Sequence, residues 1–422
     1  MKALITIAFI LTGVVAGKAE AQVWNDSGTW NQQTEDAYAQ WVESEVNEDF
    51  YLNGKWAGLA HDCADAAYYT RAIFAYENKL PFAMIDPTGS GKTVTNKMTR
   101  FNSQSEEKRV RSFLKYIANL SSTKTIGRDT YPVIVNRTYV RPGGIWARPT
   151  LMDRGLLDIL SGSAGTELPG HAEIIKRIEP TGAIWKLEST VPKAVRALNL
   201  TANMWFLPEN PQTGLRKWLT PEQYGLPFNQ LPGYSLEQFK ELGVRASTTT
   251  GEGSYPGSSQ TTGARTLDQY KTDIAKRLAM NGQTESSQDA VRRIAKSLCG
   301  SIRLRNEAVQ KAIAFKAKIG ERCLSASEYD QFSTPSRDKR ARELLKEAMS
   351  AISTFGWLSE SNIKEISSEL NACGPIEVAA GQTITLTDWA LAAADDRLSS
   401  DPNQSVGARW GLEKAQSTCP TF

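Results

Sequence analysis

Residues 171–190 read HAEIIKRIEPTGAIWKLEST, and this stretch predicts a β-hairpin. The runs at 171–178 and 183–190 contain β-branched and aromatic residues, which are typical of strands. Between them, the EPTG sequence at 179–182 supplies the proline and glycine that favour a turn. The hairpin indicates an antiparallel sheet in this part of the chain.

The sequence before the hairpin alternates between helical and strand-like patterns, which predicts an α+β fold. An apolar stripe recurs at helical spacing after Cys63, and Pro81 forbids continuation of that helix. Further strands are expected at residues 131–136, 138–141 and 145–148, and helices at residues 34–50, 63–78 and 106–119.

Residues 247–264 are almost all Ser, Thr, Gly, Pro and Gln, which predicts a linker or a long exposed loop. We therefore divide the chain into an α+β domain at 22–246 and a mainly helical domain at 265–422. In the second domain, spaced apolar residues predict helices at residues 267–280, 287–318, 337–353 and 358–372.

Residues 1–21 have the three parts of a secretory signal: Lys2, an apolar run, and the small residues Ala19 and Ala21 at the end. The run is too short for a permanent membrane helix, which needs about 20 residues. We expect a periplasmic or secreted protein with no stable membrane insertion.

Lys and Arg number 49 against 46 for Asp and Glu, so the chain is nearly neutral. No basic stripe alternates with aromatic residues, and this composition argues against a nucleic-acid partner.

Of the five cysteines, Cys299, Cys323, Cys373 and Cys419 lie in the C-terminal part and can form two disulfides in any of three pairings. Cys63 is then left alone. An odd cysteine in an exported protein indicates either a reactive thiol or a buried small residue.

Cys63 directly precedes the predicted helix, where the positive end of the helix dipole stabilises a thiolate. Asp62 and Asp65 oppose this effect, so a nucleophilic thiol there needs a cationic partner. A cysteine nucleophile usually takes histidine as its base. The chain has two histidines, and we predict His171 as the base because His61 is expected to diverge from the thiol.

A third group is needed to orient the imidazole of the base. If Ile178 pairs with Ala183, Glu188 lies diagonal to His171 on one face of the hairpin, and Glu173 shares that face. Glu188 is the predicted third residue, and an ordinary strand position is the alternative.

Three short motifs resemble the NlpC-type cell-wall peptidases of the papain-like superfamily. They are Asp62-Cys63-Ala64 at a helix start, the Pro142-Gly143-Gly144 strand entry, and Gly170-His171-Ala172 at a strand start. Gly144 stands where that family has Asp, and the separation of 108 positions between Cys63 and His171 implies an insertion. The transglutaminase-like and amidase branches therefore stay open beside the peptidoglycan branch.

The resemblance implies a papain-like α+β domain that hydrolyses amide bonds of peptidoglycan peptides or protein. Cys63 would form a thioester, His171 would carry the proton, and the Cys63 N–H would help to stabilise the oxyanion. The alternative is a non-catalytic papain-like binding or structural module whose helical C-terminal domain engages a protein partner.

The sequence gives no reason to expect a cofactor or a metal. Two histidines and no close cysteine pair do not make a typical zinc site. Residues 86–93, DPTGSGKT, resemble a phosphate-binding loop, but Asp86 stands where that pattern needs glycine.

Overall fold

The computed structural model describes residues 22–148, 170–241, 266–346 and 364–422, apart from residues 203, 205, 206, 209, 336, 339, 340, 343, 365, 366 and 370. The predicted signal peptide and the predicted linker lie outside these residues, as does most of the two helices expected at 337–353 and 358–372.

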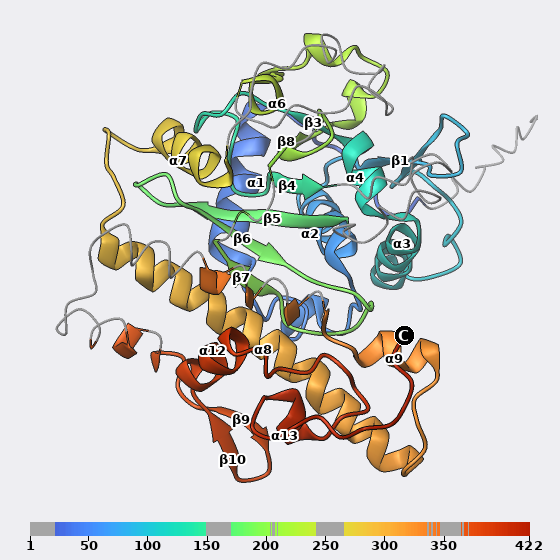
Figure 1. The fold of residues 1–422 in the computed structure, drawn as a ribbon. Coiled ribbons are helices and arrows are strands. Elements are labelled where there is room, and N and C mark those ends of the chain that lie inside the picture. Colours follow the sequence, from blue (N-terminus) through green and yellow to red (C-terminus); the bar gives the residue numbers. More distant parts are fainter. Residues whose placement is uncertain are drawn as a thin grey trace, which may run out of the picture.

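A six-stranded antiparallel sheet organises the first part of the chain (Figure 1). Its strand order is β3-β8-β4-β5-β6-β7. The strands are β3 (Thr130–Pro132), β4 (Ile145–Arg148), β5 (His171–Ile178), β6 (Ile184–Glu188), β7 (Asn199–Thr201) and β8 (Gly214–Trp218). The described chain is therefore a mixture of helix and antiparallel sheet, as the sequence predicts.

The predicted hairpin forms, and a bulge adjusts its register. Ile178 pairs with Ile184 instead of the expected Ala183. An irregularity between Ile175 and Arg177 then shifts the ladder, so that Glu173 lies opposite Glu188. The expected pairing is thus wrong at the turn and correct at the far end of the hairpin.

The first face of the sheet is covered by helices from the N-terminal part. Ala172 and Ile174 of β5 and Leu187 of β6 share one apolar core with α2 residues such as Ala67 and Ile73. The helices of this region are α1 (Gln32–Glu45), α2 (Cys63–Glu77), α3 (Glu106–Leu120) and α4 (Thr123–Asp129). The predicted helix starts at Cys63 and Glu106 are confirmed.

The second face of the sheet packs against α7 (Leu267–Leu278). Tyr270 and Ile274 of this helix share a core with Trp146, Ile175 and Leu215. Although α7 follows the predicted linker, it belongs structurally with the sheet, because its apolar stripe is buried there. The compact unit formed around the sheet thus includes residues placed beyond the expected boundary at 246.

One predicted strand is absent and another is shorter than expected. Strand β3 ends at Pro132, and residues 138–141 form a turn. Asn136 causes this turn, since its side-chain oxygen accepts hydrogen bonds from the backbone N–H of Thr138 at 3.0 Å and of Tyr139 at 3.2 Å. Local side-chain bonding of this kind competes with strand pairing.

The C-terminal part is built on α8 (Ser287–Ile319), a long helix that runs beside β7 (Figure 1). Trp389 and Trp410 are fully buried in its core. The remaining elements are α9 (Ala326–Phe332), β9 (Ile376–Ala379), β10 (Gln382–Ile384), α12 (Leu386–Ala394) and α13 (Val406–Arg409). Among the described helices, none has the length and apolar character needed to cross a bilayer.

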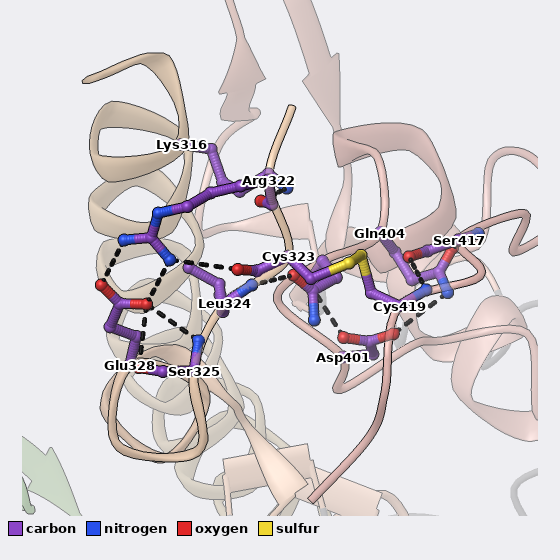
Figure 2. The surroundings of a disulfide bond; sticks show 11 residues. Lys316, Arg322, Cys323, Leu324, Ser325, Glu328, Asp401, Gln404, Ser417 and Cys419 are labelled. Atoms are coloured by element: carbon purple, nitrogen blue, oxygen red, sulfur yellow. Dashed lines mark hydrogen bonds and ion pairs between the residues drawn. A yellow bond between two sulfur atoms is a disulfide. The ribbon is translucent and has the colours of Figure 1, made fainter. Parts of the chain in front are cut away.

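Two disulfides join the C-terminal elements, Cys299–Cys373 and Cys323–Cys419, and Cys63 is free. Figure 2 shows the Cys323–Cys419 bridge beside a bidentate ion pair. In this pair the Arg322 guanidinium donates to the two carboxylate oxygens of Glu328 at 2.8 and 2.6 Å. The prediction of two C-terminal bridges is confirmed, and such bridges persist in oxidising compartments.

Asp129 joins several elements beneath the sheet. Its carboxylate accepts hydrogen bonds from the Ile85 N–H at 2.7 Å, from the Tyr224 hydroxyl at 2.9 Å, and from the Tyr68 hydroxyl. Burial raises the pKa of Asp129 to about 6, although these hydrogen bonds oppose the change. The native protein therefore holds a proton on Asp129 that the unfolded chain releases between about pH 4 and pH 6.

We predict that Asp129→Asn removes a pH-dependent contribution to stability. The wild-type free energy of unfolding should lose roughly 3 kcal/mol relative to the variant as the pH rises from about 4 to 6, since each pKa unit corresponds to about 1.4 kcal/mol. Urea unfolding at a series of pH values measures this difference. A difference that stays constant with pH would contradict the assignment.

Candidate functional site

Cys63 occupies the first position of α2, as predicted. Asp62 caps the helix, and its carboxylate accepts hydrogen bonds from the N–H groups of Ala64 at 3.0 Å and Asp65 at 3.1 Å. Cys63 is buried, with 8% of the residue exposed, and it forms no disulfide. Within the described part of the chain, nothing accepts a hydrogen bond from the Cys63 N–H.

The carboxylates beside the thiol are both engaged. Asp65 is fully buried, where it accepts from Ser121 at 2.6 Å and pairs with Lys193 at 2.9 Å. Burial, together with the charge of Asp62, raises the pKa of Asp65. Lys193, a nearby cation, is therefore already committed to a carboxylate.

His61 is fully buried and binds the segment after β6, which is consistent with the expectation that its side chain diverges from the thiol. Its Nε2 lies 3.3 Å from the Arg196 carbonyl, which requires an N–H there, and its Nδ1 lies 2.9 Å from Ser189 Oγ. Burial lowers the pKa of His61 to about 4. His61 is thus neutral and ties the entry of α2 to the segment after β6.

His171 and Glu188 form the pair that the hairpin predicts. Nε2 of His171 lies 2.6 Å from Glu188 Oε2, and Asn199 donates to the other Glu188 oxygen at 2.7 Å. All three side chains are buried. The imidazole and the carboxylate are therefore in contact, and an amide fixes the position of the carboxylate.

The pleat of β5 separates this pair from the thiol. Ala172 and Ile174 pack toward α2, so the alternating residues His171, Glu173 and Ile175 face the opposite side of the sheet. No hydrogen bond joins Cys63 to His171, both of which are described. The structure brings His171 and Glu188 together and does not bring Cys63 to them, so the expected thiol–imidazole contact is not formed.

Glu173 and Lys186 complete a buried network on the second face. Glu173 lies 3.4 Å from Nε2 of His171 and forms an ion pair with Lys186. Burial is the largest effect and raises the pKa of Glu173, but the Lys186 ammonium and the His171 contact together outweigh it and keep the pKa below its ordinary value. Both carboxylates of the network thus have cationic or donor partners.

His171, Glu173 and Glu188 could in principle hold a metal ion, because their ligand atoms lie within 4.8 Å of one another. However, Lys186 contacts Glu173, and Asn199 donates to Glu188. These donors contact Glu173 Oε2 and Glu188 Oε1, whereas Glu173 Oε1 and Glu188 Oε2 face His171 Nε2 at 3.4 and 2.6 Å. The 2.6 Å contact is a direct hydrogen bond and the Lys186 ammonium already neutralises Glu173, so the arrangement fits a neutralised polar network better than a metal centre.

The loop that resembles a phosphate-binding motif joins two antiparallel strands, β1 (Ala83–Ile85) and β2 (Thr93–Thr95). The Asp86 carboxylate accepts from the Thr88 N–H at 2.9 Å and from Ser90 at 3.0 Å. The Thr88 N–H and the Ser90 hydroxyl, which a phosphate would need as donors, therefore already bind the Asp86 carboxylate.

Sequence reasoning missed Asn199, Lys186 and a large cleft. The cleft, of about 1270 Å³, lies between β7, the loop after α1 and α8. Asn199 was not predicted because β7 has only three residues and gives no periodic signal. Lys186 could have been predicted, because it is two residues from Glu188 on the same strand and therefore lies on the same face of the hairpin. Comparison with protein-family models, curated proteins and solved structures finds no match.

We predict that His61→Gln makes the protein less sensitive to acid. The unfolded chain binds a proton at His61 near pH 6.5 and the native protein does so only near pH 4, so wild-type stability falls as the pH drops through this window. The wild-type loss relative to the variant should be on the order of 2–3 kcal/mol. Urea unfolding at pH 4, 5 and 7 gives the comparison, and parallel losses in the two proteins would refute it.

Proposed function

We propose that this chain is an exported binding module, in which a papain-like α+β unit and the helices that follow hold a ligand between them. The observation that carries the proposal is the cleft of about 1270 Å³ between the two parts. Small-molecule sites typically have volumes of about 300–1,000 Å³. The cleft therefore has room for a ligand of several residues.

The contacts of the candidate catalytic residues also favour binding over turnover. Cys63 and His171 belong to opposite sides of the sheet, and Glu173 and Glu188 are occupied by Lys186, His171 and Asn199. The two disulfides support an oxidising compartment, such as a periplasm or the cell exterior. A cell-wall peptide is the ligand class suggested by this location together with the resemblance of the motifs.

A cysteine hydrolase is the second candidate, and one observation favours it. Cys63 combines a free thiol with a backbone N–H that has no acceptor within the described residues, at the start of a helix. Those two groups serve nucleophilic attack and oxyanion stabilisation. Turnover by this route would require His171, or another base, to reach the thiol by a rearrangement.

The binding proposal predicts stabilisation by soluble muropeptides without their cleavage. The unfolding midpoint should rise with muropeptide concentration, since a ligand at about 100 times its Kd adds about 2.7 kcal/mol. Ala372→Trp, in the cleft wall, should abolish the rise, whereas Ala415→Trp, at an exposed site outside the cleft, should preserve it. Mass spectrometry should find the muropeptides intact; cleavage that is lost in Cys63→Ser would favour the hydrolase instead.

The two candidates also differ in the reactivity of Cys63. Under the binding proposal, iodoacetamide should label the thiol slowly, because Cys63 is buried. His171→Gln, which retains a side-chain amide for Glu188, should leave the labelling rate unchanged. Rapid labelling that is lost in the variant would establish a Cys–His pair. Circular dichroism confirms that each variant is folded.

A further inference from the structure

The cleft has two walls of opposite charge. The first wall carries Glu45, Glu48 and Asp49, at the end of α1 and in the loop after it. The second carries Lys296 and Arg303 on α8. Glu45, Asp49, Lys296 and Arg303 are exposed, so these charges are available to a ligand in the cleft.

These walls do not neutralise each other. Among the described residues, no ion pair joins Glu45, Glu48 or Asp49 to Lys296 or Arg303. Ion pairs at the cleft stay on one side: Lys55 pairs with Glu77, and Arg292 pairs with Glu369. Glu307 of α8, which also lines the cleft, pairs with Lys311 of the same helix.

One buried cation lies near the acidic wall. The Lys176 ammonium donates to the carbonyls of Val42 at 3.0 Å and Glu43 at 2.6 Å, and its charge offsets part of the charge of Glu45 and Glu48. The three carboxylates of the wall outnumber this one ammonium. Lys296 lies 5.5 Å from the ring of Trp185, a contact that leaves its charge unneutralised. The acidic wall thus keeps excess negative charge, and the basic wall keeps excess positive charge.

Aromatic side chains provide the apolar part of the site. Trp41 and Phe50 lie edge to face with ring centroids 5.6 Å apart, and Trp56 also lines the cleft. The cleft therefore offers an anionic wall, a cationic wall and aromatic surface. This combination matches a peptide, which carries an ammonium at one end and a carboxylate at the other.

We infer that the cleft binds a short peptide with free termini, its ammonium facing Glu45, Glu48 and Asp49 and its carboxylate facing Lys296 and Arg303. The inference rests on the proposed binding function and specifies its ligand. Recognition depends on both charges of the ligand, so a peptide that lacks either charge binds less tightly.

Isothermal titration with four forms of tetra-alanine tests this: free termini, N-acetylated, C-amidated, and blocked at both ends. The free form should bind most tightly, and each blocking group should weaken binding about tenfold. Asp49→Asn should weaken the forms with a free amine about fivefold and leave the N-acetylated form unchanged. Arg303→Gln should do the reverse, affecting only the forms with a free carboxylate.

Matched controls are Asp330→Asn and Lys108→Gln, which remove exposed charges outside the cleft and should change nothing. Equal affinity for all four peptides would overturn the inference on charge while leaving the cleft as a binding site. Absence of binding by every peptide would overturn the inference on ligand class, and the muropeptide titration then decides separately whether the binding function stands.

Discussion

The pleat of β5 is the constraint on which the candidate site depends. Each residue of a strand faces the side opposite to its neighbours, so burial of Ala172 and Ile174 against α2 commits His171 and Glu173 to the other face. Moving the imidazole to the side of the thiol would require a one-residue shift of the register of β5, which would turn the Glu173 carboxylate into an apolar core. The interior of the sheet therefore decides which chemistry its polar residues can share.

The buried charges on the second face are retained because they compensate one another. Glu173 and Glu188 would be costly to bury alone, and Lys186, His171 and Asn199 supply the donors that they need. Asn199 also belongs to the lining of the cleft, so the network reaches the cleft through one amide.

Local signals in the sequence predicted the hairpin, the start of α2 and the separation of Cys63 from the other cysteines. The capping residue Asp62 and the Pro-Thr-Gly turn act over a few positions, so they can be recognised without the fold. The face of the sheet that α2 covers, the docking of α7 and the approach of α8 to β7 depend on contacts between distant residues. The pattern at 171–175 does predict two faces, but nothing in it states which face meets Cys63.

Both edges of the sheet are closed to strand pairing with another chain. At one edge, Gly300 lets α8 approach Asn199 of β7, and the Ala202 N–H donates to Ser297 of that helix at 3.0 Å. At the other edge, β3 has three residues and ends at Pro132, which has no N–H to offer. Exposed edges act as templates for aggregation. The helix that forms one wall of the cleft therefore also protects the folded protein against self-association through its sheet.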